Sequence, residues 1–392
     1  MRKTPILLAM MIIATGQVGV SIYLPSLPLI SQDLAASHAD VQLLVTLFLV
    51  GFGASQLFYG PLSDAIGRRP VFLLGQGVYL LGTVICVAFS SDLSTLILGR
   101  LLQGLGAGSA SVLGRSVLRD SYDGPQLTKA LSYISVTASI MPIVAPVFGG
   151  WMAFYLGWQS VFLFVLIYLA AIFTLGYFVL PETNNIGKHR FNVVEVVKNY
   201  GRLLGNRQVI SSASYNWISY LTSLVSLSVM PFLLQHQIGL TAAEYGSVMI
   251  IPSAGLMLGS LTLNVLNRYL STAQLLVLSI SIMGSAGVWL LVTQTTLFNL
   301  IWAFTWLTIA QGMSFPLSIS MLLEPHKKQA GAVSALSGSI QMCLAGLFGG
   351  YLVEHWVQGQ TSLGWGYIIA ATIMVSVTYM TFRRPIIKQE FA

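Results

Sequence analysis

Charged residues are scarce in this sequence of 392 residues, because Asp, Glu, Lys and Arg together make up only 8%. Soluble domains carry about 25% of these residues, so the scarcity excludes an ordinary soluble domain. Hydrophobic residues make up 55%, and the mean hydropathy is +0.78. The composition therefore predicts an integral membrane protein.

Cysteine is almost absent as well, since the sequence contains only Cys86 and Cys343, both inside apolar runs. We interpret them as small buried side chains and expect no disulfide. The five histidines are scattered, and the sequence has no Walker loop, no Ser/His/Asp set and no metal-ligand spacing. We therefore expect no cofactor, no metal site and no enzyme, although an integral-membrane enzyme or structural partner remains an alternative.

Long apolar runs are what the sequence has in abundance. A helix that crosses the hydrocarbon core needs about 20 apolar residues, with every backbone hydrogen bond made inside the helix. The runs predict twelve transmembrane helices, near residues 5–30, 41–62, 70–90, 93–118, 127–154, 158–180, 208–235, 241–267, 272–293, 297–323, 330–356 and 362–382.

The start of the chain, MRKTPILLAMMIIATG, also has the basic end and apolar run of a secretory signal peptide. The apolar run continues past GQVGVSIYLPSLP without a convincing cleavage site of small residues. We therefore expect a retained first helix.

Positive charge lies almost entirely on one side of this topology. Every Lys and Arg except Arg100 falls in the loops on the side of the N-terminus, and the opposite loops carry none. Because Lys and Arg favour cytoplasmic loops, we expect both termini to be cytoplasmic. The net charge of +7 then faces anionic lipid headgroups, and no nucleic acid partner is needed to explain it.

The longest polar stretch divides the predicted helices six and six. We predict an N-terminal bundle at 1–180, a cytoplasmic linker at 181–207 and a C-terminal bundle at 208–392. Within the linker the apolar residues recur every three to four positions, at Phe191, Val194, Val197, Tyr200 and Leu204. This period predicts an amphipathic helix on the inner leaflet, with a plain solvated linker as the alternative.

An internal repeat supports two related halves. APVFGG (145–150) in the fifth span is echoed by AGLFGG (345–350) in the eleventh, and the QG pair of 103–104 recurs at 311–312. Short glycine matches are weak singly, but these agree in span number. They indicate two parallel six-helix halves with a substrate site at the midplane between them.

One loop, GPLSDAIGRRPV (60–71), gathers charge between the second and third spans. Gly60 and Gly67 permit close packing and a tight turn, and Asp64 needs a cation or a helix N-terminus when it is dehydrated. A loop whose charges are paired in one packing and solvated in another acts as a conformational latch. A loop that only sets topology is the alternative.

This loop resembles the G-x-L-x-D-x-x-G-R-[RK] motif of the major facilitator superfamily, matched by Gly60, Leu62, Asp64, Gly67, Arg68 and Arg69. The resemblance implies a fold of two pseudo-symmetric six-helix bundles. It also implies that the loop pairs with charges at the cytoplasmic end of the fourth span, here Arg115 and Asp120, and braces the outward-facing state.

Two further stretches resemble the same family. RLLQGLGAG (100–108) resembles its fourth-span R-x-x-Q-G-x-G-A-G pattern, and MPIVAPVFGG (141–150) resembles the G-P-x-x-G-G signature of its antiporters, with Ala145 in place of the first Gly. With SIYLPSLPLISQDL they place the chain close to the twelve-span drug/proton antiporters of the Bcr/CflA type. Arg100 inside the bilayer costs about 2.5–3.5 kcal/mol on insertion scales and is a functional candidate. Snorkelling to the outer interface is the alternative.

Acidic residues are missing from the middle of the predicted spans. Many relatives carry an acid just before YLP in the first span, where this sequence has Ser21, and the seventh span has none. The proton-site candidates are therefore Asp33, His236, Glu354 and His355, each with a helix cap or solvated loop residue as the alternative. Glu354 and His355 would be tested first, because histidine titrates near neutrality.

Aromatic, Met and amide side chains occupy the spans that surround the central cavity in the superfamily plan. Such a cavity accepts amphipathic compounds of varied shape and binds hydrated ions or sugars poorly. For a single aromatic or Met residue, core or lipid packing is the alternative. The substrate-binding candidates are Gln17, Tyr23, Gln56, Tyr59, Arg100, Gln103, Tyr133, Met141, Asn216, Trp217, Tyr220, Met249, Trp306, Gln311 and Gln341.

These residues and the resemblance predict a monomeric multidrug exporter of the bacterial inner membrane, contributing to antibiotic resistance. It would export hydrophobic drugs or toxicants in exchange for protons as the two halves rock about a central site. The alternative within the same fold is an importer of a small metabolite.

Overall fold

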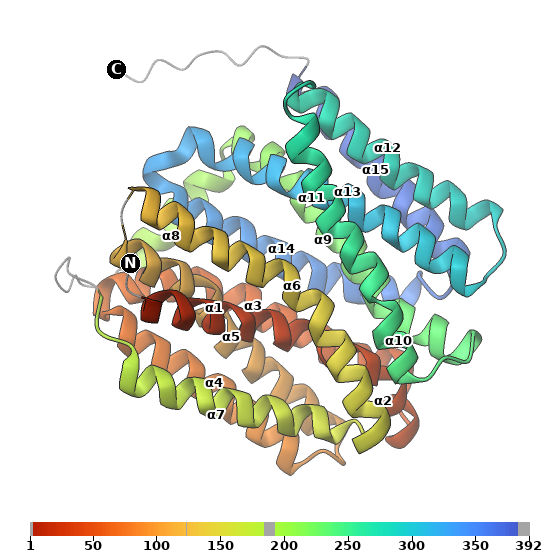
Figure 1. Cartoon of the computed structure of the whole chain (residues 1–392), viewed down its shortest axis with the longest axis horizontal. Coiled ribbons are helices and arrows are strands. Elements are labelled where there is room, and N and C mark those ends of the chain that lie inside the picture. Colours follow the sequence, from red (N-terminus) through yellow and green to blue (C-terminus); the bar gives the residue numbers. More distant parts are fainter. Residues whose placement is uncertain (1–2, 123, 184–192, 383–392) are drawn as a thin grey trace.

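The structure is a computed structural model that describes residues 3–122, 124–183 and 193–382. Figure 1 shows long helices packed side by side, and helices are the regular elements of these ranges. Eleven helical segments in the described chain are long and apolar enough to cross a bilayer. The predicted all-α membrane fold is confirmed, and α6 (Gly124–Leu156) takes the place of the fifth predicted span.

The order of the elements follows the prediction closely. The first half holds α1 (Lys3–Ser21), η1 (Leu24–Ser26), α2 (Leu27–Asp33), α3 (His38–Ile66), α4 (Arg68–Ala88), α5 (Leu93–Ser121), α6 and α7 (Gln159–Val179). After α8 (Val193–Leu204), the second half holds α9 (Arg207–Phe232), η2 (Leu233–Gln237), α10 (Ala242–Val248), α11 (Ile250–Leu266), α12 (Thr272–Val292), α13 (Leu297–Leu323), η3 (Glu324–Gln329), α14 (Ala330–His355) and α15 (Gln360–Phe382).

Short polar residues set where several of these apolar helices begin. The Ser37 hydroxyl accepts a hydrogen bond from the Asp40 backbone N–H at the start of α3, and the Asp40 carboxylate accepts one in return. The same reciprocal capping box begins α10 and α12. Asp92 caps α5, and hydrogen bonds from Thr95 lower the pKa of its carboxyl. Polar residues between the apolar runs therefore fix the helix ends.

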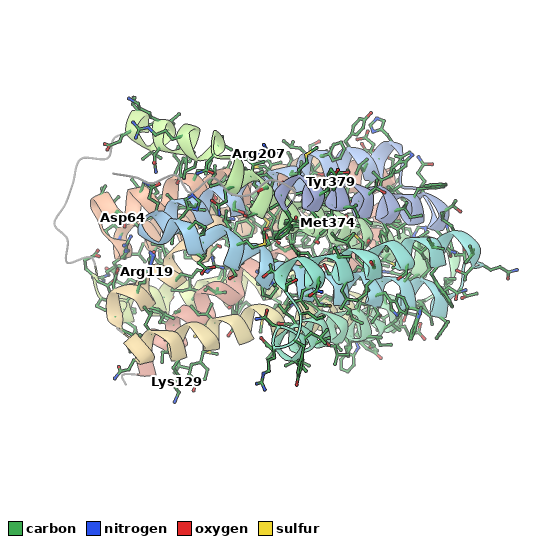
Figure 2. The ribbon with its side chains drawn as sticks, turned by 90° about the horizontal axis from the view of Figure 1, so that it is seen from above. Asp64, Arg119, Lys129, Arg207, Met374 and Tyr379 are labelled. Atoms are coloured by element: carbon green, nitrogen blue, oxygen red, sulfur yellow. The ribbon has the colours of Figure 1, made fainter. Side chains whose placement is uncertain are left out.

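The bundle has two chemically different ends. We call the end with Arg68, Arg119 and Arg207 the basic face, and the end with His38 and Trp158 the opposite face. Figure 2 shows Asp64, Arg119 and Lys129 together at one end of the N-terminal half. This arrangement agrees with the one-sided distribution of Lys and Arg in the sequence.

Two pairs of helices join the halves. α3 packs against α14 along much of its length, and α6 packs against α10 and the start of α11. Both contacts depend on glycine: a Cβ at Gly53 would lie 2.7 Å from the Ser339 carbonyl oxygen, and one at Gly246 would lie 2.6 Å from that of Pro146. The backbones approach this closely because neither glycine has a side chain.

The α6–α10 contact lies toward the opposite face, where a Cβ at Gly150 would overlap the Ala242 carbonyl oxygen. In Figure 1, α6 and α11 lie close together near α10 and move apart toward the end of the bundle that carries α8. Toward the opposite face the two halves are therefore in backbone contact, and we call this contact the seal of the opposite face.

The α8 helix lies within the predicted linker, and its apolar residues lie along one side of the helix, of which only a part is buried against the bundle. The Tyr200 hydroxyl donates to the Leu57 carbonyl of α3 at 3.1 Å, and its ring packs with Val333 and Leu336 of α14. Val194 and Val197 are exposed instead. Phe191, also predicted in the stripe, lies outside the described residues.

Candidate functional site

Arg100 is buried inside the N-terminal half, which rules out the snorkelling alternative for this structure. Its guanidinium donates to the backbone carbonyls of Leu44 and Gly19 and to the Gln103 side chain. The rings of Tyr23 and Phe48 lie 3.7 Å and 4.1 Å from its central carbon, so two cation–π contacts cover its faces. These contacts compensate much of the cost of burying the charge.

Gln103 of the same helix extends the network of hydrogen bonds around Arg100. Its amide nitrogen donates to the Thr83 hydroxyl at 2.9 Å, while its oxygen accepts from Arg100. The two residues lie three apart on α5 and therefore face the same side. Three of the predicted site residues, Tyr23, Arg100 and Gln103, are thus brought together, and they line one small cavity with Gly19.

A second polar cluster lies between α9 and α14. Asn216 donates to the Gln341 side-chain oxygen at 2.7 Å, and the Trp217 indole donates to Ser337. Gln56 of α3 reaches the same place, because its side-chain oxygen would lie 2.8 Å from a Cβ at Gly338. Four of the predicted substrate-binding residues therefore meet where α14 joins the two halves.

A third group lines a pocket between α1, α3 and α5. Gln17 of α1 and Arg115 of α5 are part of its wall, with Phe52 and Ser111. Arg115 was predicted in the latch, yet the structure places it here with an exposed side chain. It lies five residues before Asp120, so the helix turns it toward a different side.

The remaining substrate candidates do not gather at one site. Tyr59 and Met249 are packed in the hydrophobic cores of their own halves, which fits the core-packing alternative for both. Tyr220 and Met141 pack at the edge of a hydrophobic cluster that spans both halves. The Trp306 ring contacts that of Trp302 at a tilted angle, Tyr133 is exposed on α6, and Gln311 is buried in α13.

The charged loop forms a compact cluster on the basic face. Arg68 donates to Asp120 of α5 at 2.9 Å and to Asp64 of α3, and its other partner is the Ser63 hydroxyl. Gly67 has a φ of +110°, a conformation that glycine adopts without strain, and it separates α3 from α4. Gly60 packs near Val112 of α5. The cluster ties three helices of the N-terminal half together.

Glu182 is a member of this cluster that sequence reasoning missed. Its carboxylate accepts hydrogen bonds from the backbone N–H groups of Arg68 and Arg69 at 2.8 Å and 3.3 Å, at the N-terminus of α4. A carboxylate at this position is stabilised by the helix dipole. Arg69 donates to the Tyr177 carbonyl of α7. The only sequence signal was an acid just after an apolar span.

The proton-site candidates all lie toward the opposite face. Asp33 accepts from the Trp158 indole at 2.9 Å and from Gln159, which ties α2 to α7. Glu354 and His355 lie 3.8 Å apart at the exposed end of α14. His236 lies in η2, within 3.3 Å of the Gln32 amide of α2.

One polar contact between the halves was also missed. The Gln42 side chain of α3 donates to the Ser228 hydroxyl of α9 at 3.2 Å, and both residues are buried. The amide oxygens of Gln42 and Asn216 have no hydrogen-bond partner among the described residues. The sequence signal for Gln42 was an amide side chain alone inside an apolar span, because a buried amide needs a hydrogen-bond partner.

Comparison with known proteins decides the family. The model of the family described as Major Facilitator Superfamily matches residues 7–350. The chain belongs to the major facilitator superfamily. Members of this superfamily are transporters and not enzymes.

Named relatives of this superfamily cover almost the whole chain. The chain is 29% identical over 375 residues to multidrug resistance protein D of Escherichia coli (strain K12), covering 92% of this chain and 91% of the relative. It is 30% identical over 366 residues to multidrug resistance protein MdtL of Shigella dysenteriae serotype 1 (strain Sd197), covering 92% and 89%.

Solved structures agree on the major facilitator fold. A bacterial homologue of the human lysosomal transporter Spinster, described as inward-facing and unoccupied, superposes with a TM-score of 0.70 at 15% identity, covering 97% of this chain and 96% of the other. A D-xylose–proton symporter superposes with a TM-score of 0.71 at 13% identity, covering 97% of each chain. At these identities the likeness concerns the fold alone.

Proposed function

We propose that this chain exports hydrophobic or amphipathic compounds, including drugs, in exchange for protons. The observation that carries the proposal is the chemistry between the halves: buried amides and aromatic rings, with amide oxygens left without partners at Asn216 and Gln42. Such groups bind an uncharged or cationic amphipathic molecule by hydrogen bonding and stacking. The names of the two multidrug resistance relatives support the same substrate class.

The transport cycle we propose uses the seams between the halves. Because α6 and α10 are in backbone contact toward the opposite face, we propose that the compound enters from the basic face. Rocking of 1–180 against 208–392 then opens the opposite face. The resemblance implied that the loop braces the outward-facing state, yet its charges are paired here while α6 and α10 meet on the opposite face. We therefore propose that the Asp64, Arg68 and Asp120 cluster keeps the ends of α3, α4 and α5 together as one moving body.

The orientation follows from charge. We propose that the basic face is cytoplasmic, that both termini lie on that side and that the membrane is the bacterial inner membrane. We further propose that the protein works as a monomer and that α8 lies on anionic lipid. Asp33, Glu354, His355 and His236 stay candidates for the proton-carrying group.

The direct test uses purified protein in liposomes with an imposed pH gradient and a panel of lipophilic dyes. We expect dye movement that depends on the gradient and stops when a protonophore collapses it. The Asn216→Ala/Gln341→Ala variant should raise the KM for dye, whereas Thr295→Ala, in an exposed loop, should not. Transport that ignores the gradient would exclude antiport, and accumulation of a labelled sugar or amino acid without dye export would favour the importer.

A further inference from the structure

Three rings from the two halves meet on the opposite face. His38 is the first residue of α3, Phe232 ends α9, and His236 lies in η2. The ring centroid of His38 is 4.0 Å from that of Phe232 and 5.5 Å from that of His236. Two titratable rings, one from each half, therefore face each other across the seam, and both side chains are exposed to solvent from that side.

The position of His236 is set by an irregular turn. After Pro231 the chain leaves α-helical geometry and forms the π-helical turn η2, an arrangement frequent at functional sites. From this turn Gln235 donates to the Pro25 carbonyl of the N-terminal half at 3.0 Å. Leu224, Phe232 and Ala242 join the buried apolar cluster of that half. The histidines therefore lie at the rim of the seal between the halves.

A neutral His236 suits this closed arrangement. With the Gln32 amide nitrogen as the donor at 3.3 Å, the Nε2 atom of His236 must accept, and that atom accepts only when it carries no proton. Protonation of both rings places two positive charges across the seam, and their repulsion weakens the contact between the halves.

The acids on the elements packed around the pair have partners of their own. Asp33 of α2 accepts from Trp158 and Gln159, and Asp40 of α3 accepts from Ser37. Glu244 of α10 accepts from Thr241, and Glu354 of α14 lies 3.8 Å from His355. Burial, and after it the charge of the facing His236, lowers the pKa of His38.

We propose that His38 and His236 form a proton-binding pair that controls the seal on the opposite face. At neutral pH the uncharged rings close the seam, and acid on that side opens it. In the antiport cycle proposed above, protonation of the pair from the acidic side would open the opposite face. This coupling to transport rests on the proposed function, whereas the response of the seal to pH does not.

The test measures the seal itself, in full-length protein in nanodiscs without substrate. Spin labels at Ser91→Cys and Thr295→Cys, exposed loop positions on the opposite face of either half, report the separation by electron paramagnetic resonance. Cys86→Ala and Cys343→Ala remove the native thiols. Lowering the pH from 8 to 5.5 should shift the distribution to longer distances, with a rise of roughly fivefold in the open-to-closed ratio, as about 1 kcal/mol of repulsion gives.

Matched variants separate the pair from other histidines. His38→Gln/His236→Gln should abolish the shift, and His326→Gln, a histidine of the basic face bonded to Asn206, should keep it. His38→Lys/His236→Lys should hold the long distance at both pH values. An unchanged pH response in the Gln pair, or no response in the parent protein, would overturn the proposal. Dye transport measured in parallel tells whether the proposed function fails independently.

Discussion

At the scale of single residues, Arg100 shows how a charge is kept inside the membrane without an acid beside it. Backbone carbonyls, one amide and two aromatic rings take the place of a carboxylate. The planar guanidinium is essential, because it alone stacks on rings with its faces while donating along its edges. Lysine would keep the charge and lose this geometry.

We therefore expect Arg100→Lys to unfold more easily. The carbonyls of Gly19 and Leu44 would lose a donor, and each buried unpaired acceptor costs about 1–3 kcal/mol. Thermal unfolding in detergent measures the effect. Arg268→Lys, an exposed loop change, is the control. Equal melting of Arg100→Lys and the parent protein would contradict the network described here.

The turn at Gly67 gives a second residue-scale prediction. Its φ of +110° disfavours any other residue, and an added Cβ would collide with the Glu182 carboxylate. Gly67→Ala should destabilise the N-terminal half by about 1–2 kcal/mol, with lost capping of α4 contributing. Gly366→Ala, where a Cβ has open space, is the matched control in the same melting assay. A loss of the same size in both variants would count against the Glu182 contact.

At the scale of elements, α8 connects the linker to both halves. Burial, with the nearby Asp64 carboxylate adding to it, raises the pKa of Tyr200 to about 12. The hydroxyl thus keeps its proton near neutral pH and donates to the Leu57 carbonyl. The exposed valines lie on the neighbouring side of the helix, next to Lys198 and Arg202. Apolar and basic residues side by side suit an anionic lipid surface.

A fluorescent environment probe tests this placement of α8. A dye on Val197→Cys should report an apolar surrounding in liposomes with anionic lipid, and the same dye on Glu195→Cys should report water. The emission maximum measures the difference, since the two positions lie on different sides of the helix. Equal emission from both positions would indicate the plain solvated linker.

Physical reasons explain which helices and contacts the sequence predicts and which it does not. Apolar runs and one-sided Lys and Arg predict the spans, because lipid demands continuous apolar helices. Arg100 and Gln103 are predictable as neighbours, since they lie three apart on one helix. The contacts of Arg100 with Tyr23 and Phe48, or of His38 with His236, depend on how separate helices pack. No local pattern encodes them, and for the same reason Glu182 escaped notice and Arg115 was placed in the wrong cluster.

At the scale of the whole molecule, the seal on the opposite face depends on glycine contacts between α6 and α10. We expect Gly150→Val to act as a wedge, because its side chain would overlap the Ala242 carbonyl. The open-to-closed ratio on that face should rise at pH 8, measured by the spin-label pair at Ser91→Cys and Thr295→Cys. Gly366→Val should leave the distances unchanged, and a Gly150→Val protein that stays closed would contradict the proposed seal.

The glycines of both seams also bear on how fast the halves can move. Gly53 and Gly246 meet the backbone of the facing helix, and at Gly53 the sulfur of Cys343 also lies at the contact. Because the groups at these two points are small, we expect the facing helices to tilt or slide past each other with little steric resistance there. In the proposed cycle we therefore expect the rate of alternation to depend on the polar contacts between the halves that must break, such as the bond between Gln42 and Ser228.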